Sequence, residues 1–410
     1  MLRDPRRARC VGELRWVRSS QGVSLRYRPD WLDHGFALSE DLPLIDQEFL
    51  PAEPHAAAGA LADAHPEDWG ERVIRLLDRP QRLSRLDLLY LAGDDRFGAL
   101  GVSSSAARYL PRRLGPLPPL EHTAAVYEGI CRLRDGAPLS AQHAAWVASG
   151  SGFGGSSPKT LAQGRGETWL VKFAAEAGAD APLIEHATLR LARKAEIRSA
   201  ETEIVPLRAA HALAVRRFDR DGGTRLHCLS GAVALRAAGE APGYPELAQL
   251  LRRRGDGAGE RYVADMRELF RRMVYNILMD NTDDHAGNHA LIVTGGRHYG
   301  LAPAFDVSPA GFGLGVQRMR VGEQGEDATM DNALSDSSLF ALTRDGAARE
   351  ARAVARVVSG WQEHFRACGV TSGEIERCAQ QIDRPFLREQ RQEISGMRAP
   401  TRSASRHRSP

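Results

Sequence analysis

A loop of small residues, followed closely by a strand that carries a lysine, restricts the fold of this chain more than any other feature. The loop is SGSGFGGSSPK (residues 149–159), and the strand is the apolar run ETWLVKF. Gly150, Gly152 and Gly155 satisfy G-x-G-x-x-G, but a dinucleotide-binding site needs a preceding strand and an acidic residue roughly 20 positions later. Here a helix-like run precedes the loop and the corresponding residue is Lys172, which argues against a Rossmann fold.

Two other phosphate-binding patterns can be compared with the same loop. A Walker A loop needs G-K-[ST], whereas this loop ends in S-P-K-T (157–160). A kinase-like site needs a flexible glycine turn over the phosphates and then a strand whose lysine reaches the α- and β-phosphates. Lys172 stands between Val171 and Phe173 and should therefore face away from these apolar neighbours. The kinase-like pattern fits better than the other two.

The stretch NILMDNTDDHAGNH (276–289) concentrates chemically able side chains. Asp283 and Asn288 have the five-residue separation of the base aspartate and the metal-binding asparagine in H-R-D-x-x-x-x-N. The aspartate would orient or deprotonate the attacking hydroxyl, and the asparagine oxygen suits Mg²⁺, which prefers oxygen ligands. Asp306, in LAPAFDVSPA, could be a second metal ligand. Glu185, on a helix-like run, could pair with the strand lysine and fix its ammonium.

Simpler interpretations stay open for each of these segments. His285 and His289 have the i, i+4 spacing of a zinc helix, although the glutamate of H-E-x-x-H is missing and Gly287 is unfavourable inside a helix. The stretch also fits a polar turn, and the lysine and glutamate fit exposed positions. Asp284 has no place in the kinase pattern, and we expect it to have no chemical role. The kinase interpretation rests on one ordered series: the glycine loop, Lys172, Glu185, Asp283, Asn288 and Asp306.

Composition places the chain among soluble globular proteins. Its 410 residues suffice for two or three domains, and 42% hydrophobic and 26% charged residues are ordinary values. The net charge of +3 argues neither for nor against nucleic acid. Five scattered cysteines without a C-x-x-C pair indicate a reducing compartment. Because neither a signal-peptide core nor a run of roughly 20 apolar residues is present, we expect a cytoplasmic protein that does not span a membrane.

Local patterns predict a mixed first third and a helical last third. VGELRWVR, VSLRYRPDWL and DRFGALGVS are strand-like, whereas PEDWGERVIRLLDR and SRLDLLYLAG are helix-like. ALAVRRFDR should be a strand that ends in charge, and DMRELFRRMVYNILM and GAAREARAVARVVSGWQEHFRAC are amphipathic helices. The end of the chain, MRAPTRSASRHRSP, is basic and predicted to be disordered. It could add non-specific affinity for nucleic acid, but a solvated end explains it equally well.

With these motifs in place, the chain resembles the HipA family of bacterial toxin kinases over most of its length. GGSSPK is similar to the family's glycine-rich loop, WLVKF to the strand with the ATP lysine, and IEHATLRLA to the helix N-E-x-A-x-x-x-L-A. ALAVRRFDR resembles the hinge strand, NTDDHAGNHALI the motif N-x-D-x-H-x-K-N, and YGLAPAFDVSPA the motif L-x-P-x-Y-D. LADAHPEDWGERVI and DDRFGALGVS resemble the family's N-terminal subdomain.

The resemblance implies an α+β fold: a protein-kinase-like two-lobed core with an added N-terminal α/β subdomain and a mainly helical C-terminal lobe. The implied divisions are an N-terminal subdomain (1–147), a kinase N-lobe (148–222), a helical C-lobe (223–396) and a disordered basic tail (397–410). When the family's residue roles are transferred to the matching positions of this sequence, Asp283 is the catalytic base. Asn288 and Asp306 hold Mg²⁺. The backbone at the hinge meets adenine. The implied ATP-binding residues are Gly152, Gly154, Gly155, Lys159, Lys172, Glu185, Arg216, Phe218 and Asp219.

The chain departs from the family pattern in three places. The family's autophosphorylated serine lies seven residues before the loop lysine, which here falls on Gly152, with Ser151 beside it. Ser151 is therefore the first candidate for self-phosphorylation, with two loop serines as substitutes. The lysine or arginine usual before the asparagine is Gly287, and the hinge carries Arg216 where an acid can occur.

The function implied by the resemblance is transfer of the ATP γ-phosphate to a protein serine or threonine, by the toxin of a toxin–antitoxin pair. The implied partners are a protein substrate, which in the family can be an aminoacyl-tRNA synthetase, and a small DNA-binding antitoxin through which DNA is contacted indirectly. Two alternatives stay open: a regulatory or binding module with a decayed kinase core, and a small-molecule kinase on the same scaffold.

Overall fold

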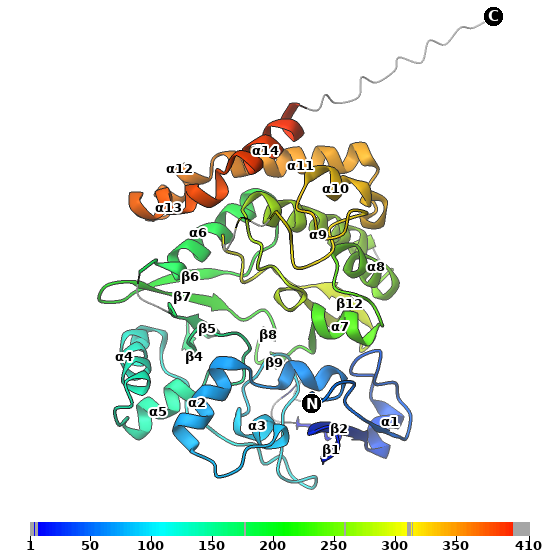
Figure 1. The fold of residues 1–410 in the computed structure, drawn as a ribbon. Coiled ribbons are helices and arrows are strands. Elements are labelled where there is room, and N and C mark those ends of the chain that lie inside the picture. Colours follow the sequence, from blue (N-terminus) through cyan, green and yellow to red (C-terminus); the bar gives the residue numbers. More distant parts are fainter. Residues whose placement is uncertain are drawn as a thin grey trace, which may run out of the picture.

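The computed structural model describes residue 4 and residues 7–175, 178–257, 260–309, 313 and 315–396. The predicted basic tail, 397–410, lies outside the described residues. The chain alternates between small sheets and helices, and its C-terminal helices form a layer of their own at the end opposite the N-terminus (Figure 1).

The first third forms a three-stranded antiparallel sheet in the order β1-β2-β3, covered by short helices. The strands and helices predicted here are confirmed with two exceptions: the strand predicted over VSLRYRPDWL ends at Tyr27, because Pro29 begins helix α1, and DRFGALGVS is not a strand. Its chain turns at Gly98 (φ 73°), and the buried Arg96 guanidinium donates to the carbonyls of Ala64 and Leu89 instead. The elements are β1 (Gly12–Val17), β2 (Gly22–Tyr27), α1 (Pro29–His34), β3 (Glu48–Phe49), η2 (Gly59–Ala64), α2 (Asp68–Asp78), α3 (Arg85–Leu91), η3 (Leu120–His122), α4 (Thr123–Arg134) and α5 (Ala141–Ala148).

A four-stranded antiparallel sheet in the order β4-β5-β7-β6 forms the centre of the molecule. Alternate residues of β5 face opposite sides, so Trp169 and Val171 pack against α2, α4 and α5, while Lys172 faces the α6 side. The predicted strands ETWLVKF and ALAVRRFDR and the predicted helix at Glu185 are confirmed. The elements are β4 (Lys159–Gly164), β5 (Glu167–Lys172), α6 (Ala181–Lys194), β6 (Thr202–Pro206), β7 (His211–Arg216), β8 (Arg220–Asp221) and β9 (Thr224–Arg225).

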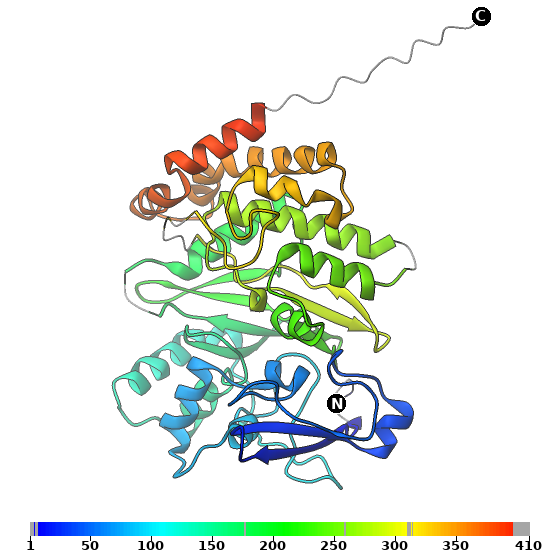
Figure 2. The same ribbon diagram turned by 45° about the vertical axis from the view of Figure 1, so that its right-hand side comes forward.

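The last part is mainly helical, as predicted, around a small sheet β10-β11-β12. Helix α9 is buried along most of its length, and α11 and α14 pack against it (Figures 1 and 2). The long run expected from residue 346 divides at Gly360 into α11 and α12. The elements are β10 (Cys228–Ser230), α7 (Gly231–Ala237), α8 (Tyr244–Arg254), α9 (Arg261–Leu278), η5 (Ala286–Asn288), β11 (Ala290–Thr294), β12 (His298–Leu301), α10 (Met330–Ser335), η6 (Ser337–Phe340), α11 (Arg344–Ser359), α12 (Trp361–Ala367), α13 (Ser372–Ile382) and α14 (Pro385–Gly396).

One hydrophobic core joins the N-terminal sheet to the C-terminal helices. Val23 and Leu25 of β2 belong to the same buried cluster as Leu229 of β10 and Val233 of α7. Helices α4 and α5, which precede the proposed boundary at residue 148, pack on the central sheet. The domain boundaries therefore stay a proposal. Within the described residues, no helix combines the length and the apolar character needed to cross a bilayer.

Asp63 makes the junction between the N-terminal part and α7 sensitive to pH. Its carboxylate accepts from the Ser230 hydroxyl and backbone N–H, both at 2.6 Å, and burial raises the pKa of Asp63 to about 6 against these hydrogen bonds. The folded state thus binds a proton more tightly than the unfolded state, so stability falls as pH rises from about 4 to about 6. We expect Asp63→Asn to gain stability relative to the wild type over this range. Thermal unfolding from pH 4.5 to 7.5 measures the difference, and a pH-independent difference would contradict the assignment.

Candidate active site

Lys172, at the end of β5, is the centre of a buried charge cluster. Its ammonium lies 2.8 Å from Glu185 Oε1 on α6 and 2.7 Å from Asp306 Oδ1 in the loop after β12. Asp306 adopts a left-handed backbone conformation (φ 57°), which an aspartate tolerates better than most residues and which turns its half-exposed carboxylate toward the lysine. Three predicted site residues that are far apart in the sequence therefore lie together in the fold.

The cluster holds its charges through mutual attraction. Burial alone would lower the pKa of Lys172, but Asp306 and Glu185 together raise it above its usual value. The charge of Lys172 in turn lowers the pKa of Asp306. Burial raises the pKa of Glu185 in spite of its lysine partner. The ammonium stays charged, and Asp306 stays ionised and able to receive a cation.

Lys159 and the glycine-rich loop lie beside this cluster. Lys159 pairs across the sheet with Lys172, and its ammonium donates to the carbonyls of Gly154 (2.5 Å) and Gly155 (2.9 Å). Gly155 has φ 90°, a conformation that favours glycine. Burial, and then the charge of Lys172, lower the pKa of Lys159 to about 8. The loop is therefore closed onto its own lysine.

Both of these positions carry lysine, although arginine is far more common than lysine in this chain. The chain contains only three lysines among 55 Lys and Arg residues, at 159, 172 and 194. Two of the three thus stand at the same end of adjacent strands, facing the same site. A compact ammonium is a point charge, whereas a guanidinium prefers planar, bidentate partners. The pattern suits phosphate oxygens approached from one side.

The base of the glycine loop is pressed against helix α2. A Cβ on Gly70 would lie 2.2 Å from the Ser151 carbonyl, and one on Gly152 would lie 3.1 Å from Arg96 Cβ. The Ser151 side chain is 1% exposed and donates to the Ala148 carbonyl. Phosphorylation of Ser151 stays a prediction, and it would require this segment to leave the helix.

The hinge strand ends in a buried network of charge. Asp219, predicted to lie near ATP, accepts from Arg217, from Arg220 and from the Gly98 backbone N–H at 2.7 Å. Both of its carboxylate oxygens thus have donors, and Arg217 and Arg220 also pair with Asp95. In this conformation Asp219 ties the hinge to the N-terminal part, and its contact with ATP stays a prediction.

An aromatic row crosses the hinge. Phe218 stacks on Phe305 with ring centroids 5.6 Å apart. Phe97 contacts Phe218 in an edge-on arrangement, with ring centroids 6.2 Å apart. Phe305 directly precedes Asp306, and Arg216 ends β7 just before the hinge. These half-buried rings offer an apolar, flat surface next to the charge cluster, where a purine could pack.

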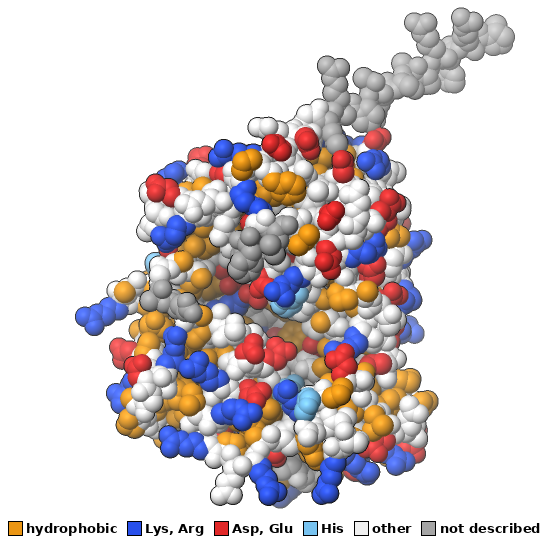
Figure 3. Space-filling model, in the orientation of Figure 1, with side chains coloured by type: hydrophobic (Ala, Val, Ile, Leu, Met, Phe, Trp, Pro, Cys, Tyr) orange, Lys and Arg blue, Asp and Glu red, His pale blue; other side chains and the backbone are white. Residues whose placement is uncertain are grey.

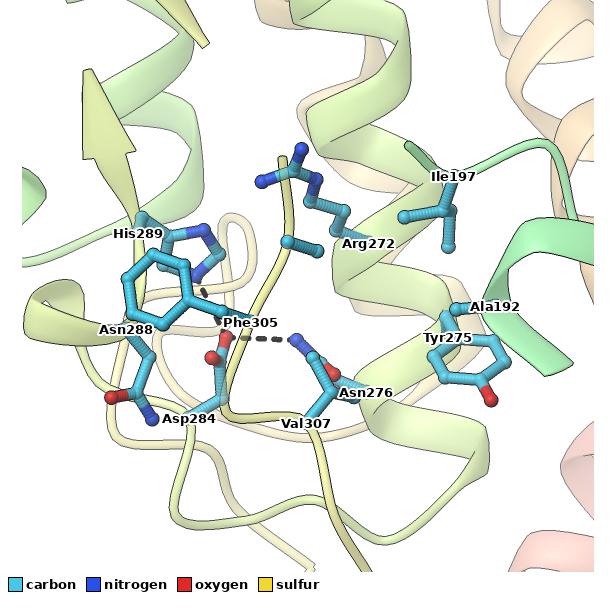
Figure 4. A pocket seen from close by; sticks show the side chains of 11 residues that line it. Ala192, Ile197, Arg272, Tyr275, Asn276, Asp284, Asn288, His289, Phe305 and Val307 are labelled. Atoms are coloured by element: carbon cyan, nitrogen blue, oxygen red, sulfur yellow. Dashed lines mark hydrogen bonds and ion pairs between the residues drawn. The ribbon is translucent and has the colours of Figure 1, made fainter. Parts of the chain in front are cut away.

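The predicted base lies on a separate loop. Asp283 is half exposed, and its Oδ1 is 2.9 Å from Nε of Arg318. Asn288 ends the turn η5, and its side chain lies next to Asp284 at a small cavity of about 10 Å³ (Figure 4). The space-filling view shows charged side chains of both signs beside a hollow at mid-height of the molecule (Figure 3).

Asp284, for which no role was expected, is a buried anchor of this loop. Its Oδ2 accepts from Tyr244 Oη, from Asn276 Nδ2 at 2.9 Å and from His289 Nε2 at 2.9 Å (Figure 4). Burial opposes ionisation, but His289 and the hydrogen bonds hold the pKa of Asp284 below its usual value. Two of these partners, Asn276 and His289, lie in the same stretch as Asp284, but only the fold brings them together with Tyr244 of α8.

Replacing this anchor should be costly. In Asp284→Asn, one amide donor would face donors from Tyr244, Asn276 and His289, so we expect a loss of about 3 kcal/mol of unfolding free energy. Thermal and urea unfolding measure the loss. Asp331→Asn, at an exposed position in the first turn of α10, is the matched control. Equal stability of the two variants would show that Asp284 does not anchor the loop.

The two histidines of the stretch do not share a helix face. His285 is exposed and its Nδ1 accepts from the Gly287 N–H, whereas His289 is buried against Asp284. A 3₁₀ turn separates them. Among the described residues no group of three or more His, Cys, Asp or Glu side chains could hold a metal. The zinc interpretation therefore lacks its geometry.

The oxygen donors fit Mg²⁺ better. Mg²⁺ often binds proteins through one or two oxygens and completes its shell with water and phosphate, so this chemistry allows Asn288 and Asp306 as ligands, which stay a prediction. In this structure the Lys172 ammonium pairs with Asp306. A nucleotide would draw that ammonium toward its phosphates and free the carboxylate.

Comparison with known proteins identifies the family. Residues 151–365 match the model of the HipA-like C-terminal domain, and residues 7–103 match the HipA N-terminal domain. Y4dM of Sinorhizobium fredii, whose name describes it as a candidate kinase, is 30% identical over 159 residues. That match covers 36% of this chain and 38% of Y4dM, so it spans well under half of that relative.

Two solved structures were compared with the chain. HipA from the toxin–antitoxin complex of Shewanella oneidensis MR-1, solved with HipB and operator DNA, superposes with a TM-score of 0.62 at 19% identity, covering 93% of this chain and 97% of that one. CtkA, a proinflammatory kinase of Helicobacter pylori, gives a TM-score of 0.37 at 11% identity over 57% of this chain and 94% of its own. The first likeness confirms the predicted HipA-like fold. Because the family model covers more than half of its residues, the chain belongs to the HipA family.

Proposed function

We propose that this protein is a serine/threonine protein kinase that transfers the γ-phosphate of MgATP to a protein hydroxyl. The observation that carries the proposal is the convergence of Lys172, Glu185 and Asp306 at the end of the central sheet, with the glycine-rich loop beside them. Phosphoryl transfer is catalysed mostly by positioning and by charge stabilisation, and these groups supply both.

The geometry suggests a division of roles. The loop backbone and Lys159 cover the phosphates, and Lys172, held by Glu185, contacts the α- and β-phosphates. The hinge backbone at Arg216 and Phe218 meets the adenine, whose faces pack on the aromatic row. Asn288 and Asp306 would hold Mg²⁺, which neutralises charge on the phosphates when bound.

In the chemical step, the oxygen of the substrate hydroxyl forms a bond to the γ-phosphorus while the bond from that phosphorus to the bridging oxygen breaks. The electron pair leaves with ADP. Asp283, half exposed at the site, accepts the hydroxyl proton. Its exposure suits a base that must receive a macromolecular substrate.

Partners follow from the family rather than from a surface of this chain. HipA of Shewanella oneidensis was solved with HipB and operator DNA, and by analogy we propose a small DNA-binding antitoxin that makes most of the DNA contact. The substrate class proposed is a protein, such as an aminoacyl-tRNA synthetase, and the location proposed is the cytoplasm.

A decayed, non-catalytic module is the second proposal to be tested, because Gly287 and the loop serine depart from the family pattern. Incubation with γ-labelled ATP and Mg²⁺, first with casein and then with cell extract, separates the proposals. Label on protein supports the kinase, label on small metabolites supports a small-molecule kinase, and ATP binding without label supports the decayed module.

A further inference from the structure

Arg318 is the basic side chain that pairs with the proposed base. Its Nε lies 2.9 Å from Asp283 Oδ1, and the arginine and aspartate side chains are 61% and 52% exposed. An arginine this exposed is seldom held by one carboxylate alone, because surface ion pairs contribute little. Its position must therefore be set by its backbone.

The backbone around Arg318 is anchored on both sides. Gln317 and Met319 are buried, and the Gln317 N–H donates to the Glu326 carbonyl at 2.8 Å. Arg320 pairs with Glu246 and Asp336 at 2.7 and 2.6 Å. Arg318 is exposed between these buried neighbours, and its guanidinium meets Asp283.

The catalytic loop itself lacks a basic residue where one is expected. Position 287, directly before the proposed metal ligand Asn288, is glycine. A Cβ there would lie 2.9 Å from Nδ1 of His285, the atom that accepts the Gly287 N–H, so any side chain would displace this ring. A positive charge for this part of the site must come from elsewhere in the chain.

We propose that Arg318 is a catalytic residue of this site, whose guanidinium binds the γ-phosphoryl group as it moves to the substrate hydroxyl. The inference rests on the proposed kinase function. The hydroxyl must lie between Asp283 and the γ-phosphorus, so a long side chain that touches Asp283 is placed next to the hydroxyl and can turn toward the transferred group. Planar guanidinium groups suit phosphoryl oxygens, and Arg318 replaces the charge that Gly287 cannot carry.

Arg318→Ala should lower kcat for γ-label transfer to casein by about 10²-fold, while the Kd for MgATP changes far less. Arg318→Lys keeps the positive charge but not the planar guanidinium, so its kcat should lie between those of the wild type and Arg318→Ala. Arg253→Ala is the matched control. Like Arg318, Arg253 is about half exposed and forms an ion pair, at 3.0 Å, with a carboxylate distant in sequence, Glu40.

Three results would overturn this inference alone, given an active wild type. They are a kcat of Arg318→Ala close to that of the wild type, a kcat above it, which would show that Arg318 slows the reaction, and a kcat of Arg318→Lys no higher than that of Arg318→Ala. A wild type that binds MgATP but transfers no γ-phosphate would instead overturn the proposed kinase function, and this inference with it.

Discussion

Asp283→Asn should reduce γ-phosphoryl transfer about 10³-fold and leave ATP binding intact. The amide has the size of the carboxylate but cannot accept the hydroxyl proton, and positioned bases contribute about 10²- to 10⁴-fold to rate. ATP affinity should persist, because the phosphates are met by Lys172 and the glycine-rich loop, on other elements. Single-turnover transfer of γ-label, together with calorimetric titration by MgATP, measures both quantities.

The control for this variant is Asp331→Asn, an exposed aspartate on α10. It should transfer phosphate at the wild-type rate. If Asp283→Asn transferred as fast as this control, the base would be another group. If it lost ATP binding as well, Asp283 would serve to hold the nucleotide.

Lys172→Met should lower transfer about 10²- to 10³-fold and also weaken ATP binding, because in the proposed site the ammonium would contact the phosphates both in the ground state and in the transition state. The substitution leaves Glu185 and Asp306 as neighbouring acids without their shared cation. Glu185, whose pKa burial already raises, can then take up a proton, so folding should suffer less than activity.

Lys194→Met provides the matched control, because Lys194 is exposed at the end of α6, the helix that carries Glu185. It should leave ATP binding and transfer unchanged. Wild-type affinity for MgATP in Lys172→Met would show that the buried lysine is structural. Thermal unfolding of both variants separates loss of activity from loss of fold.

Local patterns were sufficient for the parts of the site that depend on spacing within one segment. The alternation of ETWLVKF predicted that Lys172 faces away from Val171 and Phe173, and the helix at Glu185 formed as expected. The five-residue spacing of Asp283 and Asn288 placed both on one loop. Each of these predictions needed only the period of a strand, a helix or a turn.

Such local patterns do not predict contacts between segments that are distant in the sequence. Asp219 meets the backbone of Gly98, 121 residues earlier, and this contact turns a residue expected near ATP toward the N-terminal part. The segment DRFGALGVS failed as a strand for the same reason, because buried arginine side chains fix it. Arg318 and Tyr244, which donates to Asp284, likewise come from other elements without a local motif.

The measurement that tests the kinase site most directly is a crystal structure with Mg²⁺ and a non-hydrolysable ATP analogue. We expect the phosphates between the glycine-rich loop and Lys172, with Mg²⁺ at Asn288 and Asp306 and the adenine beside Phe218. Lys172 should then contact phosphate in place of Asp306. A nucleotide bound elsewhere, or one whose phosphates leave the Lys172–Asp306 pair intact, would contradict the account.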